Sequence, residues 1–213
     1  MTRFFLYGFA AALALFASGC VSVLPEAAPP KPRFHIAAAD AGALSGPRLS
    51  FSLVVDEPRA TRVYDSVRIA VASAPGRIEY LAGAEWADRA PRLFQTAVIQ
   101  TFEDAGRILG VGDRTAIPVA DLVLQTDIRR MELKVSGGTR AADVSVYARL
   151  SDGKGTVYAA RKFEARMPAS STEPDDAYEA FDAAFDDVIA DLVGWVYEEG
   201  EALKGETSAS LSG

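Results

Sequence analysis

The sequence predicts an α+β fold, in which a mostly antiparallel sheet of about six to seven strands is covered by two amphipathic helices. Several short segments between residues 51 and 166 alternate apolar and polar residues, as half-buried strands do. Two longer segments, at residues 90–105 and 174–195, repeat apolar residues every three or four positions. Helices with one apolar face need a sheet to cover, so a layered domain buries both kinds of element.

The chain begins with a pattern typical of an export signal. Arg3 precedes the almost entirely apolar run Phe4–Ala17, which is too short to span a bilayer because a spanning helix needs about 20 apolar residues. Ala17-Ser18-Gly19-Cys20 then resembles the bacterial lipobox, with Ala17 where that motif usually has Leu. The pattern predicts cleavage before Cys20 and lipidation of its sulfur. Ordinary cleavage after Gly19 and an uncleaved anchor are the alternatives.

Four regions follow from the composition of the chain. Residues 1–19 are the predicted signal peptide, and residues 20–33 are the lipidated cysteine with a tether that four prolines favour as an extended segment. Residues 34–197 are the predicted domain, and the small and polar residues 198–213 predict a flexible tail. Because Cys20 is the only cysteine, the domain must be stabilised by a hydrophobic core and not by disulfides within the chain.

The charge of the chain argues against nucleic acid as a partner. The formal net charge is −7, and removal of residues 1–19 with Arg3 makes it −8. An acidic protein repels phosphate backbones and anionic headgroups, so the balance also disfavours electrostatic docking to membranes. We therefore expect membrane attachment to depend on acyl chains.

The first half of the domain contains three predicted strands and one helix. The strands are Phe51–Val55, Val67–Val71 and a short one at Arg77–Leu81. Asp88 is a candidate cap of the helix, Pro91 suits its first turn and Gly106 its end. Its apolar face consists of Ala90, Leu93, Phe94, Ala97, Val98, Phe102 and Ala105. A fourth strand is predicted at residues 107–111.

The second half predicts an antiparallel meander followed by a helix. In residues 122–135 the apolar positions change parity near Arg129-Arg130, which predicts a β-bulge. Glycine-rich turns separate this strand from two more, at residues 143–150 and 156–166. From Pro174 the apolar stripe of the second helix consists of Tyr178, Phe181, Phe185, Val188, Leu192 and Trp195, and Asp175, Glu179, Asp182 and Asp186 face the other way.

The sequence contains no recognisable catalytic set. His35 is the only histidine and cannot build a zinc site alone, since such a site takes three or four ligands. Gly110-Val111-Gly112 resembles part of a dinucleotide-binding loop, but Thr115 replaces the third glycine and Pro118 follows where a helix is needed. The evenly spaced carboxylates of the second helix are typical of a solvated face. We therefore predict a protein that is not an enzyme, with no catalytic residue, no metal and no cofactor.

Three segments resemble a known family. Arg68–Val71, the segment from Ile78 to Gln95 and the later segment Ala160–Ala169 are similar to the ABC-type transport auxiliary lipoprotein family, whose members accompany MCE-domain (mammalian cell entry) lipid transporters of Gram-negative envelopes. The similarity covers roughly residues 34–197, and Ala90 departs from the larger apolar residue usual in the family. The matching positions are Tyr80, Gly83, Trp86, Ala87, Asp88, Arg89, Pro91 and Gln95.

The resemblance implies a non-catalytic periplasmic component that moves lipids or other hydrophobic molecules between membranes. Its expected partners are an MCE-domain protein and, through it, an inner-membrane ABC permease and ATPase. Val21 follows Cys20 where many lipoproteins retained in the inner membrane have Asp, so we expect an outer-membrane anchor facing the periplasm. A structural or assembly lipoprotein of the envelope, and a hydrolase with an unrecognised site, remain the alternatives.

Three residues are candidates for contact with the transport partner: Tyr80, Trp86 and Arg89. They lie in a segment that joins a predicted strand to the first helix, and loops on a rigid scaffold often carry binding residues. Tyr, Trp and Arg are also enriched at interface hot spots. The alternative is that Trp86 packs beneath the helix and that Arg89 pairs with Glu85 or Asp88.

Overall fold

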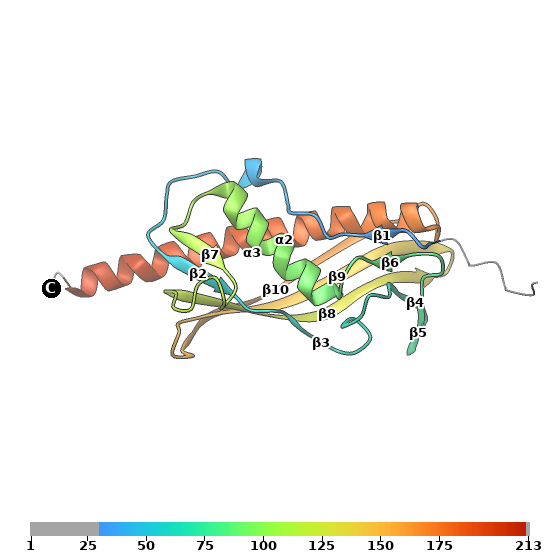
Figure 1. Ribbon diagram of the computed structural model, residues 1–213, viewed down its shortest axis with the longest axis horizontal. Coiled ribbons are helices and arrows are strands. Elements are labelled where there is room, and N and C mark those ends of the chain that lie inside the picture. The colour runs from blue at the N-terminus through green and yellow to red at the C-terminus, as the bar shows by residue number, and fades with distance from the viewer. Residues whose placement is uncertain (1–29, 212–213) are drawn as a thin grey trace, which may run out of the picture. The chain divides into compact units, whose positions relative to one another are not determined.

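A mixed sheet of eight strands forms the centre of the domain, and two α-helices cover one of its faces (Figure 1). The computed structural model describes residues 30–211, and side chains as far as Gly205. Residues from Lys31 onward form one compact unit. The α+β prediction is confirmed, and the sheet is mixed, because parallel strands join the long antiparallel strands that were expected.

The elements of the first half are β1 (Arg33–Phe34), a 3-10 helix η1 (Ala41–Leu44), β2 (Ser52–Val55), β3 (Arg59–Ala60), β4 (Ala70–Ala74), β5 (Arg77–Tyr80) and β6 (Glu85–Trp86). The second half contains α2 (Ala90–Ala105), β7 (Gly110–Gly112), β8 (Leu122–Ser136), β9 (Thr139–Ser151), β10 (Val157–Pro168) and α3 (Pro174–Leu211). The strands expected at residues 67–71 and 107–111 thus begin about three residues later, at Ala70 and Gly110.

Three long antiparallel strands, β8, β9 and β10, form the main part of the sheet. The register of β8 on β9 shifts between Ile128 and Arg130, so the predicted bulge is confirmed. The β8–β9 turn uses Gly137 and Gly138, both at positive φ, where residues with side chains are strained. The bulge lets apolar residues on either side of it face the core.

The parallel part of the sheet comes from the N-terminal half of the chain. β2, β3 and β4 each pair with β8 in parallel, and β2 pairs with β7 in parallel. Parallel neighbours need a crossover connection, and α2 lies between β2 and β7 in the chain. A separate two-stranded parallel sheet joins β1 to β6.

The helix α2 begins and ends close to the expected residues, with a different cap. Arg89 is the N-cap residue and its side chain makes no capping bond, so Asp88 does not cap the helix. Pro91 lies in the first turn, and Gly106 ends the helix at φ 62°, with its N–H donating to the Phe102 carbonyl.

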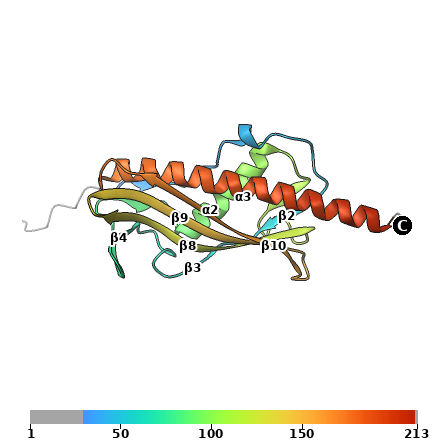
Figure 2. The ribbon, with the colours of Figure 1, turned by 180° about the vertical axis from the view of Figure 1, so that it is seen from behind.

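The core lies between the two helices and the sheet, as Figure 2 shows from behind. The apolar residues of β8 and β9 that alternate toward the helices are almost all buried. The five large aromatic side chains expected in this core are buried, and they are Phe94, Phe102, Phe181, Phe185 and Trp195.

The helix α3 continues well past Tyr197, where the sequence analysis places the start of a flexible tail. Gly200 is buried, Leu203 packs against the core, and the Lys204 Nζ donates to Asp121 Oδ1 at 2.7 Å. The domain therefore extends beyond the expected boundary, because one side of these additional turns still contacts the sheet.

Candidate functional site

The segment expected to contact a partner runs from Tyr80 to Arg89 and joins β5 to α2. Tyr80 ends β5 and is half-buried. The guanidinium carbon of Arg68 lies 3.6 Å from the centre of the Tyr80 ring, a distance typical of a cation–π contact. Tyr80 thus offers a stacked, partly exposed aromatic surface.

Trp86 lies in the core and not on the surface. Its side chain is 2% exposed, and its ring packs edge-on against Phe181 at 5.4 Å and Phe185 at 6.0 Å between ring centres. β6 holds it in place by parallel pairing with β1. Its position matches the alternative in which the indole packs beneath a helix, although that helix is α3 and not α2.

Arg89 is on the surface, with 46% of its side chain exposed, and pairs with two carboxylates, one from the β2–β3 connection and one from the β3–β4 connection. Its Nε donates to Asp65 Oδ1 at 2.7 Å and its Nη2 donates to Glu57. The hydrogen bond to Asp65 is the main cause of the raised pKa of Arg89, because it favours the charged form. The pairs expected with Glu85 or Asp88 do not form.

The other candidates from the sequence lie apart from this segment. Cys20 lies outside the described residues. His35 is exposed beside β1. A Cβ on Gly112 would lie 2.9 Å from the Ala116 side chain, so this glycine allows close packing of the following loop. Among residues 30–211, no group of three His, Cys, Asp or Glu side chains could hold a metal ion, and no helix is long and apolar enough to cross a membrane.

The outer face of the sheet, which points away from α3, carries an ion-pair network that the sequence analysis did not identify. Asp143 on β9 has only 6% of its side chain exposed. It accepts hydrogen bonds from Arg130 Nε at 2.9 Å and from Arg166 Nη2. Burial alone would raise the pKa of Asp143, but the hydrogen bonds from the two guanidinium groups lower it below its ordinary value.

Neighbouring strands extend this network. Glu164 on β10 accepts from Lys162, Arg130 and Ser145, and these contacts lower its pKa to about 2. Along β8, Glu132 accepts a 2.6 Å hydrogen bond from the Tyr64 hydroxyl. From the sequence alone, charged residues on a strand are expected to face water. These side chains pair with one another because the register of the strands brings them together.

At one end of this outer face, the β8–β9 hairpin borders a hollow of about 470 Å³, which we call the hairpin pocket. The residues that line it include three basic and two hydroxyl-bearing ones, and they are Lys134, Arg140, Arg166, Ser136 and Thr139. A second hollow of about 380 Å³ shares Lys134 and Ser136 with it and continues onto the β4–β5 hairpin. We call this second hollow the apolar hollow, because Ala72, Ala74, Pro75 and Ile78 line most of the β4–β5 side.

Comparison with known proteins gives consistent matches. The family model described as the ABC-type transport auxiliary lipoprotein component matches residues 34–193. The uncharacterized protein bll6063 of Bradyrhizobium diazoefficiens is 34% identical over 150 residues, which are 69% of this chain and 40% of that protein. The chain therefore spans about two fifths of the length of this curated relative.

Two solved structures share the fold. The crystal structure of protein XCC0632 from Xanthomonas campestris has 31% identity and a TM-score of 0.74, covering 84% of this chain and 99% of that one. The crystal structure of another uncharacterized protein has a TM-score of 0.61 at 11% identity, covering 79% of this chain and 99% of that one. The second match indicates a common fold only.

Proposed function

This chain belongs to the ABC-type transport auxiliary lipoprotein family, and from that premise we propose that it is the outer-membrane-anchored, periplasmic subunit of an ABC transport system that contains an MCE-domain protein. In this role it binds its partner and does no chemistry itself. The cargo that this proposal assigns to the system is a lipid or another hydrophobic molecule. The family match over residues 34–193 carries the proposal.

The N-terminal sequence supports the anchor. Cys20 follows a short apolar run and small residues, and Val21 stands where many lipoproteins retained in the inner membrane have Asp. The prolines between residues 21 and 32 favour an extended tether, with a reach of a few tens of Å at about 3.1 Å per residue. Such a tether lets the domain meet a partner in the periplasm.

The segment from Tyr80 to Arg89 supports a binding role. Tyr80 and Arg89 are both accessible and are held by neighbours, Tyr80 by the guanidinium of Arg68 and Arg89 by two carboxylates. Side chains that are already ordered lose little entropy on binding, which favours affinity. Trp86 takes part indirectly, because its packing in the core fixes the segment between Tyr80 and Arg89.

The proposal is tested by capturing the anchored protein from detergent-solubilised envelopes of its own host and identifying the bound proteins by mass spectrometry. We expect an MCE-domain protein and an ABC ATPase with the wild-type chain. The variant Tyr80→Ala with Arg89→Ala is expected to lose them. Tyr158→Ala with Arg48→Ala, two exposed positions elsewhere on the domain, is the matched control and is expected to retain them.

Capture of envelope assembly proteins without any transport component would instead favour the structural role. If both double variants retain the same partners, Tyr80 and Arg89 are not part of the interface. Separation of the two membranes on a sucrose gradient tests the location, and recovery of the protein mainly with the inner membrane would contradict the outer-membrane anchor.

A further inference from the structure

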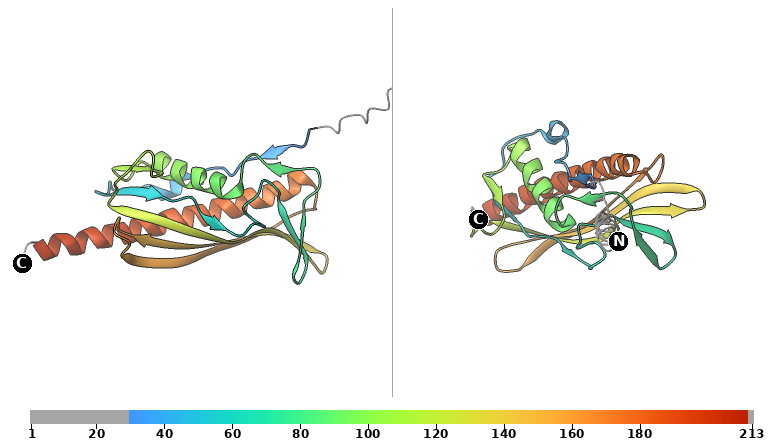
Figure 3. Two further views of the ribbon diagram at one scale, coloured as in Figure 1. Left: turned by 60° about the horizontal axis from the view of Figure 1, so that its bottom comes forward. Right: turned by 45° about the vertical axis from the view of Figure 1, so that its right-hand side comes forward.

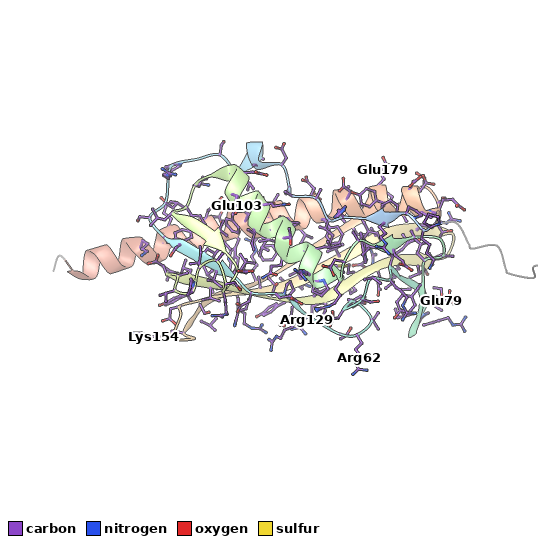
Figure 4. All side chains as sticks on the ribbon, viewed as in Figure 1. Arg62, Glu79, Glu103, Arg129, Lys154 and Glu179 are labelled. Atoms are coloured by element: carbon purple, nitrogen blue, oxygen red, sulfur yellow. The ribbon has the colours of Figure 1, made fainter. Side chains whose placement is uncertain are left out.

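The charges of this acidic protein are strongly segregated. Of the 29 Asp and Glu residues of the chain, 11 lie in α3, together with only one of the 22 Lys and Arg residues. The rest of the chain therefore has 18 acidic and 21 basic residues. Figure 4 shows Glu179 on α3 at one side of the domain and Arg62, Arg129 and Lys154, with Glu79 of β5, at the other. The net negative charge is thus a property of the helix and not of the outer sheet face.

The hairpin pocket lies on this less acidic side. Leu133 and Ala142 pair across β8 and β9 and face the core, so the adjacent pair Lys134 and Ala141 faces outward, because side chains alternate along a strand. Arg166 pairs with Asp143 on the same outer face. The sheet therefore separates Lys134 and Arg166 from the carboxylates of α3. Arg140 pairs with Val135 at the intervening position and borders the pocket at its hairpin end.

Two of the three basic groups of the pocket are uncompensated. Within the part of the chain that the structure describes, neither Lys134 nor Arg140 forms an ion pair or a side-chain hydrogen bond. Arg166 donates to Asp143 through one nitrogen, and a guanidinium has five N–H donors. The nearest carboxylates bond to other groups: Asp143 accepts from Arg130 and Arg166, and Glu132, which lines the neighbouring apolar hollow, accepts from the Tyr64 hydroxyl.

These groups have the chemistry of a phosphate site. Arg and Lys bind phosphate through charge-assisted hydrogen bonds, and a cluster of them beside hydroxyl groups suits a tetrahedral anion. The Ser136 and Thr139 hydroxyls border the same hollow. We propose that the hairpin pocket binds the phosphate of an anionic lipid headgroup.

The neighbouring apolar hollow favours a lipid over a soluble phosphate ester. It meets the hairpin pocket at Lys134 and Ser136, and its wall includes Ile78, a large apolar side chain that is 37% exposed. Inorganic phosphate has no apolar part for this surface to bind. A headgroup phosphate with its glycerol and the start of an acyl chain would contact both hollows.

The position of the pocket is also compatible with contact with a bilayer. This argument rests on the lipid anchor of the proposed function. β1, near which the described domain begins, lies at the same end of the domain as β4, β5 and the β8–β9 hairpin, and the C-terminal end of α3 lies at the opposite end (Figures 1 and 3). The N-terminal tether therefore joins the domain at the end that carries the hairpin pocket.

The test measures binding of the chain from Val21 to Gly213, without its lipid, to phosphatidylglycerol-containing and to purely phosphatidylcholine vesicles at low ionic strength. The pocket variant is Lys134→Gln with Arg140→Gln. The control is Arg48→Gln with Lys154→Gln, which removes the same charge from exposed positions near β2 and the β9–β10 turn. All four side chains are exposed, so we expect unchanged melting temperatures.

We expect wild-type and control proteins to bind the anionic vesicles and the pocket variant to bind roughly 25-fold more weakly, since each basic group near an anionic bilayer strengthens binding about fivefold. If vesicle binding is weakened equally in both variants, only the overall charge matters, and the hairpin pocket is not the binding site. Absence of wild-type binding would also overturn the proposal. If calorimetry shows binding of glycerol 3-phosphate and the protein does not bind vesicles, the ligand is a soluble phosphate ester. This result would contradict the proposal that the ligand is a lipid. Because the vesicle assay uses unlipidated protein, it is independent of whether Cys20 is acylated.

Discussion

Gly200 of α3 lies directly against the ring of Phe51, so closely that a Cβ at Gly200 would be 2.4 Å from Phe51 Cε1 and 2.6 Å from Cζ. Phe51 immediately precedes β2 and is fully buried. Such distances are shorter than any van der Waals contact, so no larger residue fits without movement of the ring. This contact attaches the C-terminal turns of α3 to the sheet.

We therefore predict that Gly200→Ala destabilises the domain by about 1–3 kcal/mol, the usual cost of overpacking a core. Gly205→Ala is the matched control in the same helix, since a Cβ there meets nothing within 4 Å. Alanine favours a helix over glycine by up to about 1 kcal/mol, so the control is expected to be neutral or stabilising. Urea unfolding followed by circular dichroism measures both. Equal stabilisation by the two substitutions would mean that α3 does not dock on Phe51.

The position of Trp86 predicts a structural role that differs from that of Tyr80. Trp86→Ala removes an indole packed against Phe181 and Phe185, and such truncations cost about 3–5 kcal/mol. Tyr80→Ala removes a half-buried ring at the end of β5 and is expected to cost much less. Chemical denaturation of the two variants tests this difference. A Trp86→Ala protein as stable as the wild type would place the indole on a surface and not in the core.

The network around Asp143 predicts acid sensitivity. Its hydrogen bonds from Arg130 and Arg166 lower its pKa below the ordinary value of 3.8, so they stabilise the folded state above about pH 4 and this stabilisation is lost as the pH falls through the lowered pKa. Asp143→Asn is expected to lose roughly 1–3 kcal/mol near neutral pH, because the two guanidinium groups lose a charged acceptor. Its melting temperature should then change less on acidification than that of the wild type.

Thermal melts between neutral pH and about pH 3 measure this effect. Asp104→Asn, which changes an exposed carboxylate on α2, is the control and is expected to follow the wild-type profile. An Asp143→Asn protein with the same pH profile as the control would show that the network contributes no pH-dependent stability.

The parts of the fold that depend on local pattern could be predicted from the sequence. The apolar faces of both helices and the bulge near Arg130 follow from spacing along a single segment. The parallel pairing of β2 and β4 with β8 could not, because it joins residues about 60 to 70 positions apart and leaves no local signal. The sequence therefore predicted the long antiparallel strands and not the parallel strands that join them.

Two further differences have the same kind of cause. Residues after Tyr197 are mostly small or polar, and a glycine such as Gly200 usually favours the end of a helix, so contacts with residues distant in the sequence, such as Phe51 and Asp121, explain why α3 continues. Asp143 is a charged residue in a strand, and its burial depends on arginines from two other strands. Similarly, an aromatic residue in a short connection, such as Trp86, could face a partner or the core, and the sequence left both open.

The last prediction concerns Cys20, which lies outside the described residues and whose lipidation is a proposal from the sequence. Diacylglycerol is attached through a thioether, which requires sulfur, so Cys20→Ser is expected to abolish labelling by a fatty-acid analogue and to leave the precursor unprocessed. Ser18→Ala keeps a small residue in the motif and is expected to be labelled normally. Gel mobility reports processing, and in-gel detection of the analogue reports acylation. Equal labelling of Cys20→Ser and the wild type would place the acyl chain elsewhere and would remove the basis for a tether that begins at residue 20.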